Sequence, residues 1–149
     1  MARYSAGCLT GAGSATLPII SLYGQSTTNP VSPRIREIGV FNTTNTAVAL
    51  KLVRITTAGT KGTALTEAKH DPDAPAAVAT AFNTHSSTGP TLGDDLGYRC
   101  VLGAAAGSGV VWTFGDNGLQ VPASDTGAIG VIVENGTGQI CQAYIVWDE

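Results

Sequence analysis

Charged residues are scarce in this sequence. Lys, Arg, Asp and Glu make up 13% of the 149 residues, and the formal net charge is −3, whereas a globular domain usually carries about 25% charged residues. A nucleic-acid-binding domain would instead show a basic patch or stripe. The composition therefore indicates that this protein has no nucleic-acid partner.

The few charges are distributed unevenly along the chain. Seven of the eight Lys and Arg residues lie within residues 1–69, and nine of the eleven acidic residues lie within residues 70–149. Interleaved strands would mix the two halves in space, which is the interpretation we favour. The alternative is a bipolar surface suited to ordered assembly.

Long apolar segments are absent too. No stretch approaches the roughly 20 apolar residues that cross a membrane as a helix. The opening residues, Met-Ala-Arg-Tyr-Ser-Ala-Gly, lack the apolar core of a secretory signal peptide. We therefore expect a protein that is synthesised and folded in a cytoplasm and has no membrane partner.

Cysteine and histidine are rare. The cysteines, Cys8, Cys100 and Cys141, are far apart and show no Cys-x-x-Cys spacing, so we expect free or buried thiols. Both histidines, His70 and His85, lie in polar stretches and are expected to be solvated. A zinc site needs three or four ligands at suitable spacing, which these residues supply only if distant positions meet in space.

Catalytic motifs are missing. There is no Gly-x-Ser-x-Gly elbow, and the aspartates that a glycosidase could pair stand beside Gly, Pro or Asn, where aspartate commonly stabilises turns. A calcium site in these loops has little support, because no Asp-x-Asp-x-Asp-Gly run is present. We predict no catalytic, cofactor-binding or metal-binding residue, and therefore no enzyme.

Short apolar runs, separated by turn residues, dominate what is present. Helical periodicity is nearly absent and there are 19 glycines, a pattern typical of an all-β protein. Strands are expected at Thr16–Tyr23, Arg34–Phe41, Ala47–Thr56, Tyr98–Leu102, Val110–Phe114, Gly127–Glu134 and Gln139–Trp147. We predict one antiparallel β-sandwich over residues 34–149, preceded at residues 1–33 by a short, loop-rich N-terminal arm and the first strand.

Turn residues refine this division. Asn135-Gly136 predicts a hairpin between the last two strands, and Asn117-Gly118 predicts a further turn, because both residue types accept the positive φ of tight turns. Gly24–Pro33 is expected to be a loop, since its prolines cannot donate to a ladder. Thr84–Asp95 is also expected to be a surface loop. Asp71–Phe82 is either a short helix capped by Asp73 or a strand preceded by a turn.

Alternation assigns side chains to the two faces of each strand. Ile129, Val131 and Val133 share one face, and in another strand so do Val48, Leu50 and Leu52. The last strand is apolar on both faces: one carries Ile140, Tyr144 and Val146, and the other carries Cys141, Ala143, Ile145 and Trp147. Such a strand is either central and covered twice or has an outer face that contacts a partner.

The order of features from Pro33 onward resembles a known group of proteins. It consists of Arg34-Ile35-Arg36-Glu37-Ile38, then Val48–Arg54 with the loop Thr57-Ala58-Gly59-Thr60, then Asp71-Pro72-Asp73, and finally a Gly-rich region ending in Tyr144-Ile145-Val146-Trp147-Asp148-Glu149. This order resembles the small β-sandwich head proteins of tailed bacteriophages, notably capsid decoration (cement) proteins and related minor virion proteins. The likeness covers about residues 33–149.

The resemblance implies a jelly-roll-like sandwich, often trimeric, that sits on the capsid surface and has no cofactor. Its implied partners are the major capsid protein and copies of itself. Possible contacts are Arg34, Arg36, Tyr144 and Trp147, and residues 1–33 could lie over a neighbouring subunit as an arm. The alternatives are a carbohydrate-binding or receptor-binding module of a fibre or tail, with Trp112 or the loop Thr84–Asp95 on the sugar, and, with less support, a small hydrolase.

Overall fold

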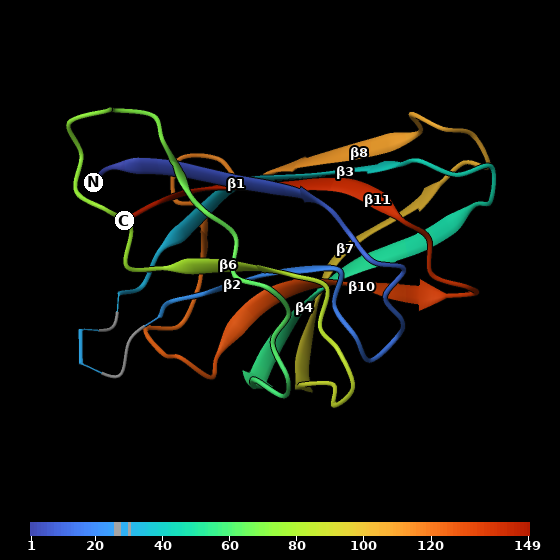
Figure 1. Cartoon of the computed structure of the whole chain (residues 1–149), viewed down its shortest axis with the longest axis horizontal. Coiled ribbons are helices and arrows are strands. Elements are labelled where there is room, and N and C mark those ends of the chain that lie inside the picture. Colours follow the sequence, from blue (N-terminus) through green and yellow to red (C-terminus); the bar gives the residue numbers. More distant parts are fainter. Residues whose placement is uncertain (26–27, 30) are drawn as a thin grey trace.

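The chain folds as a β-sandwich of two antiparallel sheets (Figure 1), seen in a computed structural model that describes residues 1–25, 28–29 and 31–149. The described residues form eleven strands: β1 (Arg3–Leu9), β2 (Ile20–Tyr23), β3 (Arg34–Asn42), β4 (Val48–Thr57), β5 (Ala68–Lys69), β6 (Thr80–Asn83), β7 (Thr91–Leu102), β8 (Gly109–Thr113), β9 (Leu119–Gln120), β10 (Ala128–Asn135) and β11 (Cys141–Asp148). They contain no helix that is long and apolar enough to cross a membrane.

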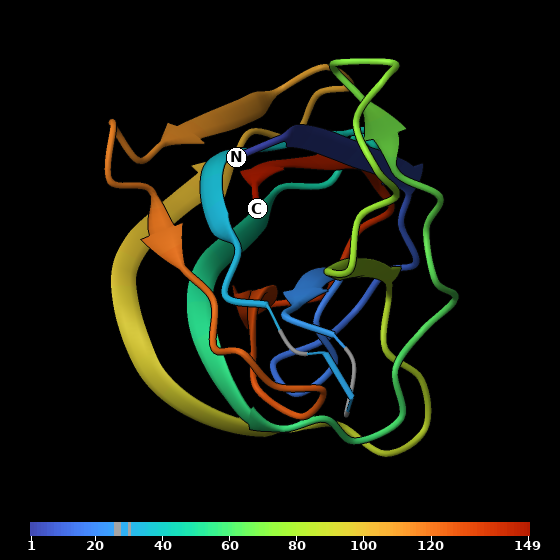
Figure 2. The same cartoon turned by 90° about the vertical axis from the view of Figure 1, so that its left-hand side faces the viewer.

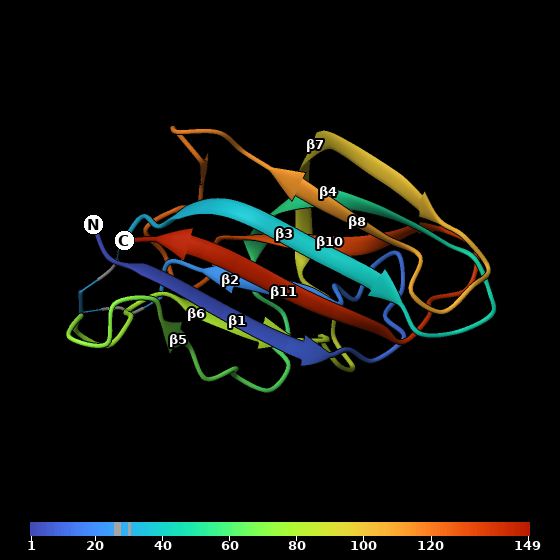
Figure 3. The same ribbon diagram turned by 90° about the horizontal axis from the view of Figure 1, so that it is seen from above.

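The first sheet, sheet A, has the strand order β5-β1-β11-β3-β8, and the short β9 pairs with the start of β3. Figure 3 shows β1, β11, β3 and β8 side by side. The second sheet, sheet B, has the order β6-β2-β10-β4-β7. Its strands β4 and β7 curve strongly (green and yellow in Figure 2), and their pairing contains several register shifts. The termini lie side by side, because Ala2 and Glu149 exchange two backbone hydrogen bonds.

The core lies between the two sheets, and the predicted inward faces are confirmed. Ile129, Val131 and Val133 of β10 are at most 1% exposed, and the alternating apolar residues of β4 are buried opposite β11 and β3 in the same cluster. Trp147 of β11 stacks on Tyr4 of β1, with ring centroids 5.8 Å apart. Alternation sufficed here because a strand buried on one face repeats its apolar residues with a period of two.

The N-terminal arm was predicted wrongly. β1 pairs with β11 along its whole length, from Arg3 to Leu9, and lies inside sheet A. The predicted strand Thr16–Tyr23, in contrast, is confirmed by β2, which lies between β6 and β10 in sheet B. Tyr4 and Ala6 of β1 are buried in the core and Cys8 packs against it, and such a short alternation among Ser, Gly and Ala is a weak strand signal. Residues 26, 27 and 30 of the predicted loop Gly24–Pro33 lie outside the described residues.

The predicted final hairpin is also wrong. Gly136 has the expected positive φ of 80°, but β10 pairs with β2 and β4 while β11 pairs with β1 and β3. The Asn135-Gly136 turn therefore carries the chain from sheet B to sheet A. A turn signal reports that the chain reverses, and it contains no information about which strand each arm then pairs with.

Two other segments can be compared with their expectations. Of the two alternatives for Asp71–Phe82, the strand preceded by a turn is confirmed and the helix is not, because turns lead to β6, which begins at Thr80. The predicted loop Thr84–Asp95 is wrong at its end, because β7 begins at Thr91. The uneven charges along the chain are mixed in space, as ion pairs such as Arg3–Asp148 and Lys51–Asp95 join its two halves.

Candidate functional site

The outer face of sheet A holds three of the four predicted contact residues. Arg34 and Arg36 lie on β3 and Tyr144 on β11, all half-buried. Trp147 is 0% exposed and belongs to the core, so its prediction as a surface contact is wrong. The reason is alternation along β11, which turns Trp147 inward with Ile145 and leaves Tyr144 outward with the exposed Gln142.

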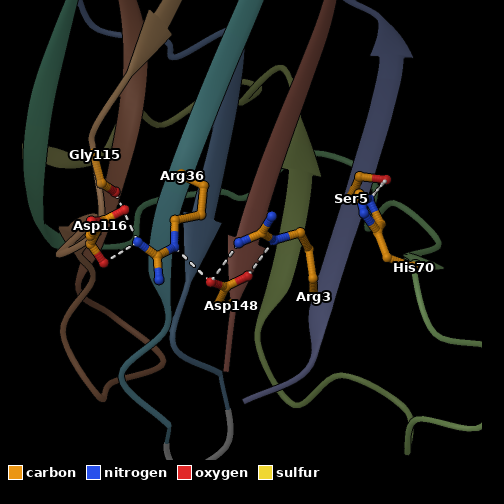
Figure 4. A network of polar contacts seen from close by, with 7 residues as sticks. All are labelled: Arg3, Ser5, Arg36, His70, Gly115, Asp116 and Asp148. Carbon is orange, nitrogen blue, oxygen red and sulfur yellow. Dashed lines mark hydrogen bonds and ion pairs between the residues drawn. The ribbon is translucent and has the colours of Figure 1, made fainter.

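One end of this face is an arginine–carboxylate network that spans three neighbouring strands (Figure 4). Asp148 accepts hydrogen bonds from Arg3 Nε at 2.7 Å and Nη2 at 3.0 Å, and from Arg36 Nε at 2.6 Å. The Asp148 side chain is only 8% exposed. Hydrogen bonds from Arg3, and then from Arg36, lower the pKa of Asp148 against the effect of its burial. The carboxylate therefore stays ionised and fastens β1 and β3 to β11.

Both arginines of β3 also hold the turn between β8 and β9. Arg36 Nη1 donates to the Gly115 carbonyl at 2.8 Å and to the Asp116 carbonyl, and Arg34 Nη1 donates to the Asn117 carbonyl at 2.8 Å. At the other side of the network, His70 Nε2 lies 3.3 Å from Ser5 Oγ (Figure 4). The guanidinium groups are thus pre-positioned by the chain's own contacts.

In the middle of the face, the aromatic ring of Tyr144 packs over a glycine of the neighbouring strand. Tyr144 lies directly across from Gly39 of β3, and a Cβ atom at Gly39 would come within 2.1 Å of the Tyr144 ring. The Tyr144 hydroxyl donates to Glu37 Oε1 at 2.5 Å. Burial, and then this bond to Glu37, raises the pKa of Tyr144 to about 12. The ring is held down at both ends and is rigid.

The same arrangement recurs one row further along the sheet. Phe41 lies across from Gly109 of β8, and a Cβ atom at Gly109 would come within 2.1 Å of the Phe41 ring. Around the two rings are three exposed aliphatic side chains: Leu9 at 55%, Val111 at 45% and Ile140 at 44%. We call these five residues the apolar patch. No charged residue stands in the two cross-strand rows that contain Tyr144 and Phe41.

A second polar cluster was missed by the sequence analysis. His85, expected to be solvated, is 2% exposed, and its Nε2 lies 2.9 Å from the Tyr23 hydroxyl. Burial lowers the pKa of His85 to about 4. Lys61 Nζ lies 4.2 Å from the centroid of the Tyr23 ring and donates to the Asp125 carbonyl at 2.6 Å. The sequence analysis missed this site because the sequence neighbours of His85 are polar, whereas the residues that surround it in space come from other segments.

Other candidates from the sequence are accounted for by their surroundings. Trp112 is 8% exposed and packs in the main core. All three cysteines are free, as expected. Within residues 1–25, 28–29 and 31–149 there is no pocket and no group of three His, Cys, Asp or Glu side chains that could hold a metal ion. The chain matches no protein-family model, and no curated protein or solved structure is significantly similar to it.

Proposed function

We propose that this protein is a non-enzymatic structural protein of a virus particle, which decorates or cements the capsid of a tailed bacteriophage. Its partners would be the major capsid protein and, in a trimer, further copies of itself. We interpret the strand order as a jelly roll, with β1-β11-β3-β8 facing β2-β10-β4-β7, a fold common in viral capsid and lectin domains. The likeness of residues 33–149 to phage head proteins also supports this proposal.

The outer face of sheet A is the observation on which the proposal depends. Its apolar patch presents two rings and three exposed aliphatic side chains on one continuous sheet. Covering such a patch is favourable by about 25 cal/mol for each Å² of apolar surface removed from water. Because Tyr144 is already fixed by Gly39 and Glu37, little conformational entropy is lost when a partner covers it.

Attachment through an N-terminal arm, in contrast, has lost its support. Residues 3–9 form β1, whose Arg3 side chain pairs with Asp148 and whose Tyr4 and Ala6 are buried. Removing them would take a strand out of sheet A. The proposal therefore places the capsid contact on the sheet and not on an arm.

Capsid attachment provides the test. Mass spectrometry of purified phage particles should find a copy number proportional to the lattice points of the capsid, and absence from particles would contradict the proposal. Binding to capsids that lack the protein should fall at least about tenfold for Val111→Glu, since an unpaired charge is costly in an apolar interface. Val101→Glu is the matched control, because Val101 is a 74% exposed strand valine on sheet B.

A carbohydrate-binding module is the second candidate, and the placement of Tyr144 favours it. A ring that covers Gly39 on one side is able to stack on a sugar with the other, and the exposed Gln142 lies beside it on the same strand. This candidate moves the predicted sugar platform from the buried Trp112 to Tyr144. Glycan binding that is lost in Tyr144→Ala, together with absence from capsids, would favour it over the first.

A further inference from the structure

Two loops lie over part of the outer face of sheet B and contact each other. They are residues 58–66 and 84–90, which we call the cover. Thr60 N–H donates to the Thr88 carbonyl at 2.8 Å, and Ser86 N–H donates to the Thr60 carbonyl at 3.3 Å. A Cβ atom at Gly59 would come within 2.6 Å of the Gly89 backbone. The two loops are thus in direct backbone contact.

The cover pairs with the edge strand β6 through an isolated bridge between Ala64 and Phe82, beside which Asn83 N–H donates to the Thr63 carbonyl at 2.9 Å. Leu65 N–H donates to the Ala81 carbonyl of β6 at 2.9 Å, and His85 N–H donates to the Pro18 carbonyl at 2.9 Å. Under it lies a small apolar cluster, separate from the main core, of Tyr23, Ile55 and Ala128, with Ala58, Phe82 and Leu92 packed against them. The cover therefore shields apolar side chains that point away from the main core.

The His85 imidazole stands between the cover and the sheet. It belongs to the cover, is 2% exposed, and bonds the Tyr23 hydroxyl of β2 through Nε2 at 2.9 Å, while Nδ1 has no hydrogen-bond partner among the described residues. The bond to Tyr23 joins the cover to the strand below it. A buried imidazole in this position is accommodated as the neutral form, because burial penalises charge.

The charged groups around His85 offer no compensation for a proton. Lys61, from the other loop of the cover, places its ammonium 4.2 Å from the Tyr23 ring centroid and 5.1 Å from that of Phe82. Asp125 contributes its backbone carbonyl to Lys61. β2 presents Ser21 and Tyr23, and β4, β6 and β10 contribute Ile55, Phe82 and Ala128 to the apolar cluster. No ion pair joins His85 to a carboxylate in the part of the chain that the structure describes.

We propose that the cover is an acid-sensitive lid on sheet B, which neutral His85 holds closed and which opens when His85 takes up a proton. Opening hydrates the imidazole and exposes the apolar cluster around Tyr23 to solvent. The device regulates access to a second apolar surface, on the side opposite the apolar patch. It does not depend on the proposed attachment to a capsid.

The expected pH dependence of the opening constant of the cover follows from proton linkage. In the closed state, burial lowers the pKa of His85 to about 4, the Ala58 carbonyl opposes this shift, and Lys61 adds to it. In an open, solvated state the pKa returns to about 6.5. The closed form is therefore favoured fully above pH 6.5, and the opening constant rises about tenfold per pH unit as the pH falls from 6.5 towards 4. The total rise is about 300-fold.

Amide hydrogen exchange on the full chain tests the lid. Between about pH 7.5 and about pH 4.5, after correction for the intrinsic exchange rate, protection at Thr60, His85 and Ser86 should fall about tenfold per pH unit below 6.5. Protection in sheet A should stay constant. His85→Gln, which stays neutral, should abolish the pH dependence, and His70→Gln, at the exposed histidine, should preserve it.

Three results would overturn the proposal. They are pH-independent protection of the cover, an unchanged slope in His85→Gln, and an equal loss of protection in both sheets, which would report global acid unfolding. Should His85→Gln fail to fold, NMR titration of the His85 imidazole in the natural protein provides the test, because it measures the apparent pKa of this side chain. An apparent pKa well below 6.5 supports the lid, and a value at 6.5 contradicts it.

Discussion

The two outer faces of the sandwich bear apolar side chains that the chain treats differently. On sheet B, outward residues such as Tyr23 and Ile55 are covered by the loops at residues 58–66 and 84–90 and are at most 2% exposed. On sheet A, Leu9, Val111 and the rest of the apolar patch stay in contact with solvent. The chain's own loops therefore cover apolar side chains on the outer face of sheet B and leave the apolar patch on sheet A uncovered.

The uncovered parts of the two faces differ as well. Sheet B carries ion pairs across β4, β7 and β10, in which Asp95 accepts from Lys51 at 3.2 Å and Arg99 pairs with both Asp95 and Glu134. Sheet A concentrates its ion pairs at one end, around Asp148, and has no charged residue in the two cross-strand rows of Tyr144 and Phe41. Charged residues are depleted from the cores of protein interfaces, so the partner that we propose would cover sheet A and not sheet B.

The largest loss of stability is expected when a tyrosine on sheet B is removed, and a tyrosine on sheet A provides the comparison. Tyr23→Ala removes a fully buried side chain together with its bond to His85 and its edge contact with Phe82, and should destabilise the protein by about 3–5 kcal/mol. Tyr144→Ala removes a half-buried ring and one surface hydrogen bond, and should cost about 1 kcal/mol. Urea unfolding measures both. Equal losses would contradict the contrast between a covered and an open face.

The arginine network should have the next largest effect. Asp148→Asn leaves Arg3 and Arg36 without their shared carboxylate and should cost about 2 kcal/mol at neutral pH. Because folding lowers the pKa of Asp148 below 3.8, its contribution is complete above 3.8 and is lost as the pH falls through the folded value.

Acid unfolding of Asp148→Asn should therefore lack this component. Asp116→Asn serves as the control, because the hydrogen bond that joins Asp116 to Arg36 uses its backbone carbonyl (Figure 4), which this substitution keeps. A variant that unfolds in acid as the natural protein does would show that the network contributes nothing to stability.

A smaller effect is expected at the glycine beneath Tyr144. Gly39→Ala places a methyl group within 2.1 Å of the ring, whereas in the same row a methyl group at Gly7 would be 3.2 Å from its nearest neighbours. The ring must move in the first variant, at a cost of about 1–2 kcal/mol, whereas in the second the neighbours of the methyl group need to shift by only a few tenths of an ångström. Loss of the bond to Glu37 should lower the pKa of Tyr144 from about 12 in Gly39→Ala only. Ultraviolet titration of the tyrosines reports this, and identical curves for both variants would exclude a fixed ring.

The sequence predicted correctly which side chains face the core, but it did not predict which strands pair with one another. The apolar alternation of Ile129, Val131 and Val133 is local, and it predicted burial correctly. The assignment of β10 and β11 to different sheets depends on hydrogen bonds between residues far apart in sequence, such as the pairing of Arg3 with Asp148. The same applies to the candidate sites. Polar neighbours in sequence suggested a solvated His85, while its burial arises from Tyr23 and Lys61, which come from other segments.

The smallest effect is expected on the open part of sheet B. Lys51 and Asp95 are both partly exposed, and their ion pair is screened by water and salt. Lys51→Ala should therefore leave the urea midpoint unchanged within error, at low and at high ionic strength.

If the charges on sheet B instead prevent association with other proteins, their removal should change the oligomeric state. Sedimentation of a Lys51→Ala, Arg99→Ala double variant should then detect self-association that the natural protein lacks. A clear loss of stability without association would show that both faces use their charges in the same way, and the contrast between them would then rest on the cover alone.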